Sequence, residues 1–154
     1  MLVDRDGTIV IDEPYNGDPA KVQPVPGARE AIDRIRARGL PVGVLTNQSG
    51  VGRGLITMQQ MEAVNRRIDE LLGPFDGWFI CPHAPDEACE CRKPKPGLLL
   101  EAARKFGVEP ESIVVIGDSD ADIGAARNAG AGAIRIDAQT SLSDAVDALL
   151  ARSA

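Results

Sequence analysis

The chain has 154 residues, of which 44% are hydrophobic and 26% are charged, and it carries a net charge of −6. Such a length and composition predict one globular domain, residues 1–154, with a substantial core. The acidic balance argues against a broad surface for nucleic acid or an anionic membrane, but not against a small phosphate ligand held by a few cations. No stretch has the apolar length of a transmembrane helix, and the chain opens on a predicted strand rather than a signal peptide. We therefore expect a cytoplasmic monomer whose partner is a small molecule, with no nucleic acid or membrane partner.

Apolar runs and turn signals alternate along the whole chain. Strands are predicted at residues 2–3, 41–46, 77–80, 113–116 and 133–136. Helices are predicted at residues 26–38, from 57 onward, and at 96–106, 121–129 and 141–151, with loops at 10–26 and 47–54. Only three residues precede Asp4, so the first strand is either unusually short or lacks its beginning. This alternation predicts an α/β fold, a Rossmann-like doubly wound and mainly parallel sheet with helices on both faces.

The helix that begins at Thr57 has the clearest local signals. Gln60 stands three residues after Thr57, which is the spacing of a capping box. Its apolar residues recur at helical spacing and predict the buried face, which we expect to be formed by Met61, Val64, Ile68 and Leu71.

Two carboxylates, Asp4 and Asp6, follow the first strand directly. Paired acids repel each other and resist desolvation, so a buried strand that ends in them needs a compensating partner. Mg²⁺ favours oxygen ligands and binds through one or two carboxylates beside a phosphate. The pair therefore indicates a site where one carboxylate attacks a phosphoryl group and the other moves a proton. Taken alone, these residues are equally compatible with a solvated acidic turn.

Three further polar motifs also stand at the ends of predicted strands or the start of a helix. They are Thr46-Asn47-Gln48, Arg92-Lys93-Pro94 and the acidic run 117–122, which contains Asp118. In parallel sheets, ligands bind at the carboxyl ends of the strands. Phosphoryl transfer needs a nucleophile, a metal and donors for the phosphoryl oxygens, and these motifs together supply all three.

The order of these motifs resembles the haloacid dehalogenase superfamily of phosphohydrolases. The matching patterns are Asp-x-Asp-Gly-Thr at 4–8, Thr-Asn-Gln at 46–48, Arg-Lys-Pro at 92–94 and Gly-Asp-Ser-x-x-Asp at 117–122. Longer strings at 4–9, 46–54 and 91–97 resemble the branch that contains D-glycero-D-manno-heptose 1,7-bisphosphate phosphatase and the histidinol-phosphate phosphatase domain. The resemblance covers essentially the whole chain and implies a core without a large cap domain.

The resemblance also implies a role for each catalytic position. Asp4 would be the nucleophile that becomes an aspartyl-phosphate, and Asp6 would protonate the leaving oxygen and then activate water. Thr46 and Lys93 would hold the transferring phosphoryl oxygens, where a lysine neutralises charge that the phosphate and the nucleophile bring together.

A magnesium site follows from the same resemblance. Asp118 would bind Mg²⁺ together with the Asp4 carboxylate and the backbone carbonyl of Asp6. Asp122, at the end of the same acidic run, would support this site without binding the metal directly.

All three cysteines and the one histidine of the chain lie between residues 81 and 91. Cys81, His83, Cys89 and Cys91 form a Cys₃His set, which suits a tetrahedral, structural Zn²⁺ without an open position. A Cys89–Cys91 disulfide would be strained by the one-residue spacing and would not persist in a reducing compartment, and a redox pair would not need His83. The resembling branch carries a zinc loop at this place, and Cys91 lies two residues before Lys93. We expect the loop to anchor the lysine.

Substrate choice depends on the residues around this centre. Asn47, Arg53 and Arg92 are the candidate substrate-binding side chains, and the two guanidinium groups suit a second, non-reacting phosphate. For Arg53, an ordinary place on the surface is nearly as good an interpretation. We expect a sugar bisphosphate, with removal of the 7-phosphate of D-glycero-D-manno-heptose 1,7-bisphosphate, and histidinol phosphate is the alternative.

Two functions from other classes also fit part of the pattern. A receiver-like signalling domain uses an acidic pair, a phospho-accepting Asp, a Thr and a Lys on a doubly wound sheet. Asp6 favours turnover instead, because it can activate the hydrolytic water, and a zinc loop is unexpected in a receiver. A zinc-dependent interaction module with a decayed site is the other alternative, but the complete set of acids and lysine argues against it.

Overall fold

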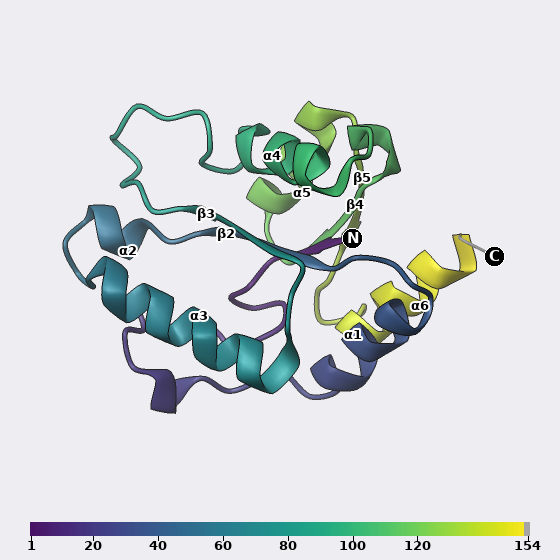
Figure 1. Ribbon diagram of the computed structural model, residues 1–154, viewed down its shortest axis with the longest axis horizontal. Helices are drawn as coiled ribbons and strands as arrows, with labels where there is room; N and C mark the ends of the chain where they lie inside the picture. Colours follow the sequence, from purple (N-terminus) through teal and green to yellow (C-terminus); the bar gives the residue numbers. More distant parts are fainter. Residues whose placement is uncertain (153–154) are drawn as a thin grey trace.

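The computed structural model describes residues 1–152, which are built around a five-stranded parallel sheet (Figure 1). Its order is β3–β2–β1–β4–β5, and the strands are β1 (Leu2–Val3), β2 (Gly43–Asn47), β3 (Gly77–Cys81), β4 (Val114–Gly117) and β5 (Gly132–Arg135). The central strand β1 pairs in parallel with both β2 and β4. The chain therefore winds outward from β1 in one direction and then in the other. This arrangement places the ligand crevice at the carboxyl end of β1.

Helices cover both faces of the sheet, as the alternating pattern predicts (Figure 1). They are α1 (Ala28–Ala37), α2 (Ser49–Gly52), α3 (Met58–Leu72), α4 (Gly97–Phe106), α5 (Asp120–Ala129) and α6 (Leu142–Arg152), with short 3₁₀ turns at Pro19–Lys21 and Pro110–Ser112. Buried side chains of α1, α3 and α6 form the core on one face, and those of α4 and α5 form the core on the other. The predicted doubly wound α/β fold is confirmed.

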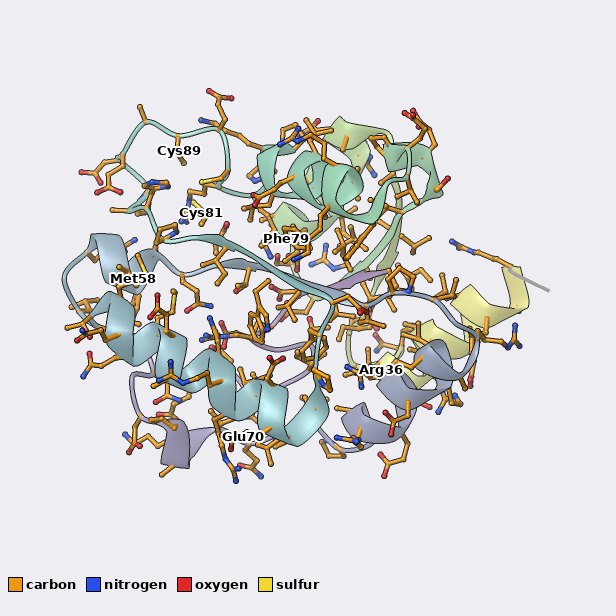
Figure 2. The ribbon with its side chains drawn as sticks, viewed as in Figure 1. Arg36, Met58, Glu70, Phe79, Cys81 and Cys89 are labelled. Atoms are coloured by element: carbon orange, nitrogen blue, oxygen red, sulfur yellow. The ribbon has the colours of Figure 1, made fainter. Side chains whose placement is uncertain are left out.

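Alternation along the strands sends neighbouring residues into different cores. Leu2 packs in the core under α4 and α5, whereas Val3 packs under α1, α3 and α6, and both are fully buried. Phe79 points from β3 toward α4, where its ring meets Phe106 edge-on (Figure 2). Because both faces are covered, the central strands are apolar without interruption, as in buried parallel sheets. The polar residues that follow these strands therefore lie together at the carboxyl ends of the strands.

Strand β1 has only two residues, but backbone hydrogen bonds extend its pairing at both ends. The N–H of Gly43 donates to the carbonyl of Met1, and the N–H of Asp4 donates to the carbonyl of Ile116, each over 3.0 Å. The backbone of Asp4 is thus fixed to β4 although Asp4 lies beyond the strand. Within residues 1–152, no helix combines the length and the apolar character needed to cross a membrane.

The predicted elements are present, with bounds that differ by one or two residues. Helix α1 begins at Ala28 rather than at 26, because Gly27 has a left-handed backbone with φ of 79° and cannot belong to the helix. The segment 47–54, predicted to be a loop, contains the short helix α2. Its first residues lie against the carboxyl end of β2, where the backbone N–H of Gln48 donates to the carbonyl of Cys81 over 2.7 Å.

Helix α3 has the predicted capping box. The N–H of Gln60 donates to Thr57 Oγ1 over 3.0 Å, and the N–H of Thr57 donates to Gln60 Oε1 over 2.9 Å. The buried face differs from the prediction at its end, since Leu71 is half-buried and Leu72 is buried. That face also contains one polar residue, Asn65, beside its apolar members Met61, Val64, Ile68 and Leu72.

Candidate active site

The ammonium group of Lys93 is the best-satisfied polar group at the carboxyl edge of the sheet. Its Nζ donates to Asp4 Oδ1 over 2.8 Å, to the carbonyl of Leu45 over 2.9 Å and, very closely, to Asp122 Oδ1. Lys93 is only 4% exposed, and these three bonds use all three of its N–H donors. Burial alone would lower the pKa of Lys93, but the charges of Asp4 and Asp122 outweigh it, so its pKa is raised. The lysine is therefore charged as well as buried.

Asp122 is held just as firmly, because it also caps the helix on which it stands. Its Oδ2 accepts hydrogen bonds from the N–H of Ser119 over 3.1 Å and from Ser119 Oγ over 2.9 Å, while Oδ1 accepts from Lys93. A side chain on Gly117 would place its Cβ 2.3 Å from Asp122 Oδ2, so only glycine allows this approach. Both oxygens of Asp122 are engaged, and the side chain is completely buried. Sequence reasoning gave Asp122 a supporting place behind the metal ligands, and the structure makes it a direct partner of the lysine.

Three carboxylates gather around this lysine. Oxygens of Asp4, Asp118 and Asp122 all lie within 4.8 Å of one another. Burial raises the pKa of Asp4 to about 7, Lys93 opposes this rise, and Asp122 adds to it. One lysine does not compensate three carboxylates in a desolvated place.

This donor set fits a hard divalent cation such as Mg²⁺. Asp118 is exposed, so its carboxylate is open to a ligand on the solvent side. Gly7 has φ of 80°, and a Cβ there would lie 2.2 Å from Asp118 Oδ2. The turn after Asp6 therefore needs glycine to pass this close to the carboxylate.

Asp6 is not part of this carboxylate cluster. Its carboxylate accepts hydrogen bonds from Arg5 Nε, at 3.1 Å to each oxygen, and from Gln48 Nε2 over 3.0 Å. Gln48 Nε2 also donates to Thr46 Oγ1 over 2.7 Å. Asp6, Gln48 and Thr46 thus form one hydrogen-bonded row along the site, with Thr46 almost completely buried.

A cavity of about 240 Å³ opens beside Asp6. Its polar lining comes mainly from Arg5, Asp6, Asp12, Glu13 and Gln48. Arg5 is paired with Asp6, so the two further acids leave the lining with a negative balance.

Asn47, which also lines this cavity, is hydrogen-bonded to the backbone of Lys93. Lys93 N–H donates to Asn47 Oδ1 over 3.0 Å, and Asn47 Nδ2 donates to the Lys93 carbonyl over 3.2 Å. Both ends of the amide are therefore taken up by the backbone of the lysine. The structure shows Asn47 holding the segment around Lys93, and its part in substrate binding stays a prediction.

The two candidate arginines have different surroundings. Arg53 is exposed and lines an open cavity of about 630 Å³, together with Leu55 and Asp86. Arg92 is half-buried, and its NH1 nitrogen is buried without a hydrogen-bond partner among the described residues. An unsatisfied buried guanidinium donor is costly, so this nitrogen of Arg92 lacks a partner that would stabilise it.

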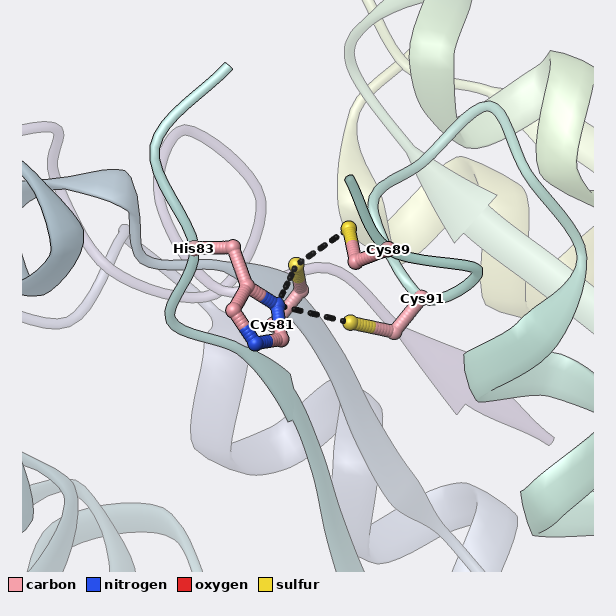
Figure 3. A group of neighbouring side chains, drawn as sticks. All are labelled: Cys81, His83, Cys89 and Cys91. Atoms are coloured by element: carbon pink, nitrogen blue, oxygen red, sulfur yellow. Dashed lines mark hydrogen bonds between the residues drawn. The ribbon is translucent and has the colours of Figure 1, made fainter. Parts of the chain in front are cut away.

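The Cys₃His set predicted from the sequence comes together in the loop between β3 and α4 (Figures 2 and 3). The distance is 3.8 Å between the sulfurs of Cys81 and Cys89, 3.4 Å from Cys81 Sγ to His83 Nδ1 and 3.2 Å from His83 Nδ1 to Cys91 Sγ. Tetrahedral zinc with bonds of about 2.3 Å holds sulfur ligands about 3.8 Å apart. The spacing therefore fits a closed, four-ligand zinc site.

The three thiols differ in acidity, and burial raises the pKa of Cys81. The backbone N–H of Arg92 lowers the pKa of Cys89 to about 7. Burial raises the pKa of Cys91 to about 12, and its hydrogen-bonded neighbours Cys81 and Cys89 raise it further. Three thiolates side by side need a positive charge among them, which zinc supplies when it is bound.

The sequence did not predict the side chains that form hydrogen bonds with the site residues and so fix their positions. Gln48 stands inside a quoted motif, but nothing in its spacing shows that it joins Asp6 to Thr46. Arg5 stands between the two motif acids and reaches Asn65 on α3, 60 residues further along the chain. A polar residue on the apolar face of a helix was the only signal of that contact.

Comparison with known proteins gives a consistent picture. A family model described as haloacid dehalogenase-like hydrolase matches residues 1–130. Over 132 residues the chain is 40% identical to the D-glycero-beta-D-manno-heptose-1,7-bisphosphate 7-phosphatase of Pseudomonas aeruginosa, with 82% of this chain and 74% of that protein covered.

Two solved structures resemble the fold. The D,D-heptose 1,7-bisphosphate phosphatase of B. bronchiseptica, complexed with magnesium and phosphate, superposes with a TM-score of 0.89 at 29% identity and covers 99% of this chain and 98% of its own. A putative phosphatase of this family from Mesorhizobium loti has a TM-score of 0.78 at 35% identity, with 84% and 68% covered.

The raised pKa of Asp4 predicts how stability depends on pH. Between about pH 4 and pH 7 the folded chain keeps a proton on Asp4 that the unfolded chain has lost, so folded stability falls as pH rises through this window. In Mg²⁺-free protein, Asp4→Asn should therefore raise the free energy of unfolding at pH 8 by roughly 1–3 kcal/mol, and by much less at pH 5. Thermal melts from pH 5 to pH 8, with zinc left in place, measure this difference. Asp86→Asn at an exposed position is the control, and identical pH profiles for Asp4→Asn and wild type would contradict the prediction.

Proposed function

The chain belongs to the haloacid dehalogenase-like hydrolase family, and from this premise we propose that it is a Mg²⁺-dependent phosphatase that removes the 7-phosphate of D-glycero-D-manno-heptose 1,7-bisphosphate. Relatives named for this activity are 33–40% identical to it. The observation that carries the proposal is the buried Lys93, which holds Asp4 at the carboxyl end of β1 beside two further carboxylates. This is an arrangement for receiving a phosphoryl group next to a metal.

Asp4 is the nucleophile of the proposed reaction. Lys93 holds Oδ1 at 2.8 Å and Thr8 lies 3.4 Å from Oδ2, so the carboxylate has a fixed direction before substrate binds. One of its oxygens attacks phosphorus, the bond to the leaving oxygen breaks, and an aspartyl-phosphate forms. Water then attacks the phosphorus of that intermediate, which returns Asp4 and releases inorganic phosphate.

Asp6 carries the proton in both steps. It lies half-buried beside the cavity, where it gives a proton to the leaving oxygen in the first step. In the second step the same carboxylate takes a proton from the attacking water. Its position away from the three-carboxylate cluster suits this task, because proton transfer needs access to the cavity rather than to a metal.

Thr46 receives a phosphoryl oxygen in this proposal, and Lys93, whose three N–H donors already have partners, contributes its positive charge. Gln48 donates to Thr46 Oγ1, which leaves the hydroxyl hydrogen of Thr46 free for a phosphoryl oxygen. Lys93 places its positive charge beside Asp4, where the charges of nucleophile and phosphate meet.

The Mg²⁺ of the proposal would be held by the carboxylates of Asp4 and Asp118 and by the backbone carbonyl of Asp6. When bound, it neutralises negative charge on the carboxylates and on the phosphoryl group. Asp122 is not among the direct ligands in this assignment, because Lys93 and Ser119 occupy both of its oxygens.

A second phosphate of the substrate would be bound by Arg92, with Arg53 further out. Arg92 has an unpartnered buried donor, whereas the cavity beside Asp6 has a negative balance and would repel a phosphate. That cavity suits sugar hydroxyls, which donate to carboxylates. It would also attract an ammonium group, and this favours histidinol phosphate as the second candidate substrate.

Substrate preference separates these two candidates. We expect kcat/KM for the heptose bisphosphate to exceed that for histidinol phosphate by at least about tenfold, because Arg92 gains a phosphate partner only with the bisphosphate. Arg92→Gln should lower kcat/KM for the bisphosphate about 10- to 100-fold and have a smaller effect on a monophosphate ester. Arg127→Gln, at an exposed position of α5, is the matched control. Equal losses on both substrates would remove Arg92 from the second phosphate site, and a preference of wild type for histidinol phosphate would reverse the substrate assignment.

The nucleophile can be tested by removing its charge alone. Asp4→Asn should lower phosphate release roughly 10³-fold or more, because an amide neither attacks phosphorus nor forms the acyl phosphate. Asp120→Asn, an exposed acid at the start of α5, should keep activity near that of wild type. Mass spectrometry must show that residue 4 has not deamidated. Wild-type turnover by the intact Asn variant would exclude Asp4 as nucleophile.

We also propose that Cys81, His83, Cys89 and Cys91 bind one structural Zn²⁺ per chain. The loop they form is joined to the site on both sides: Gly52 N–H donates to the Pro82 carbonyl over 2.8 Å, and Cys91 lies two residues before Lys93. A fixed loop thus places the lysine segment against Asn47.

Elemental analysis should find close to one zinc per purified chain. Cys89→Ser should lose zinc, increase hydrogen exchange over residues 81–95 and lower kcat, because the backbone that places Lys93 becomes mobile. Glu90→Gln, in the same loop, should keep both zinc and activity. Full activity and unchanged exchange in a zinc-free Cys89→Ser chain would show that the loop needs no metal.

The proposal also covers the oligomeric state of the protein and its cellular compartment. We propose that residues 1–154 form one domain that acts as a monomer in the cytoplasm. The two cores on opposite faces of one sheet support a single domain. Light scattering on the purified chain would test the monomer.

A further inference from the structure

The carboxylate of Asp6 is gripped by the residue directly before it in the sequence. Arg5 Nε donates to both oxygens over 3.1 Å, and Arg5 NH2 lies 3.1 Å from Oδ1. Gln48 adds one bond to Oδ2. A guanidinium that approaches both oxygens of a carboxylate fixes its plane as well as its position.

Arg5 can only hold Asp6 if Arg5 is itself fixed, and the fold fixes it twice. Its side chain is nearly completely buried, and its NH1 donates to Asn65 Oδ1 over 2.9 Å. Its backbone carbonyl accepts bonds from the N–H groups of Thr8, Ile9 and Val10 over 3.1–3.3 Å. The guanidinium therefore stands between the turn after β1 and the buried face of α3.

Asn65 is an unusual residue for its place, because it is a polar side chain on the buried face of α3. It is 7% exposed and stands on the face of α3 that Val64 and Ile68 bury against the core. A buried amide costs stability unless it is hydrogen-bonded, and a leucine would fill the same place without that cost. Its Oδ1 accepts a hydrogen bond from Arg5, which is in turn the partner of Asp6.

We propose that Arg5 and Asn65 are positioning residues for proton transfer by Asp6, an inference that rests on the proposed phosphatase function. Lys93 compensates Asp4 and Asp122, and Arg5 compensates Asp6, so the two motif acids do not compete for one cation. Arg5 holds the carboxylate of Asp6 where it lines the cavity. It also stabilises the negative charge that remains on Asp6 after the proton has passed to the leaving oxygen.

Loss of the positioning role of Arg5 and Asn65 has a kinetic effect that a loss of packing does not have. A sugar alkoxide is a poor leaving group and needs the proton, whereas 4-nitrophenolate leaves without it. Asn65→Leu keeps the apolar face of α3 filled and removes the acceptor of Arg5. It should lower kcat on the sugar bisphosphate about 10-fold or more but change kcat on 4-nitrophenyl phosphate less than about threefold.

Two further variants keep the test decisive. Ile68→Val removes one methyl from the same helix face without touching Arg5, and it should leave the ratio of the two kcat values unchanged. Arg5→Lys keeps the charge but cannot reach both Asp6 oxygens and Asn65, so it should show the same selective loss as Asn65→Leu. If Asn65→Leu does not fold, Arg5→Lys carries the test.

The outcomes are distinguishable. Equal losses on both substrates, or no loss, would overturn the positioning role while leaving the phosphatase intact. Wild-type protein that releases no phosphate from either substrate in Mg²⁺ would instead overturn the proposed function on which this inference rests.

Discussion

The buried ammonium of Lys93 is the contact on which the rest of the site depends. It joins three parts of the fold that are distant in sequence, since its oxygen partners belong to the turn after β1, to β2 and to α5. The backbone N–H and carbonyl of Lys93 both form hydrogen bonds with the side chain of Asn47. The segment that precedes Lys93 is the Cys₃His loop.

The negative charge around Lys93 exceeds its single positive charge, and this excess explains the chemistry proposed for the site. One lysine stands among three carboxylates, and burial raises the pKa of Asp4 to about 7. Such an arrangement lowers folded stability and is retained where function requires it. A divalent cation and a phosphoryl group together would complete the charge balance. The second acid of the motif is kept out of this balance by Arg5, which gives Asp6 a separate, solvent-reachable place.

Much of this could be predicted from the sequence, for identifiable reasons. The strands were recognisable because a doubly covered parallel sheet needs uninterrupted apolar runs, and the polar residues after them must then meet at one edge. Cys81, His83, Cys89 and Cys91 were recognisable because four ligands so close in sequence are brought together by one loop. The capping box of α3 was recognisable because it depends on residues three apart.

What sequence reasoning missed depends on contacts between distant segments. The contact of Arg5 with Asn65 spans 60 residues, and no local pattern shows which buried polar group meets which. The two hydrogen bonds between Asn47 and the backbone of Lys93 span 46 residues, and only the fold shows them. The end of the α3 face differs because Leu72, not Leu71, is four residues after Ile68 and so lies on its side of the helix.

Lys93 and Asp122 form the buried charge pair that organises the site. A double-mutant cycle with Lys93→Met, Asp122→Asn and the double variant, unfolded by urea without Mg²⁺, measures their interaction energy directly. Lys93→Met leaves the buried Asp122 without its charge partner, and Asp122→Asn leaves Lys93 with Asp4 as its one paired carboxylate. We therefore expect the double variant to be more stable than the sum of the single losses predicts, by about 2 kcal/mol or more. Additive losses, within about 0.5 kcal/mol, would contradict it.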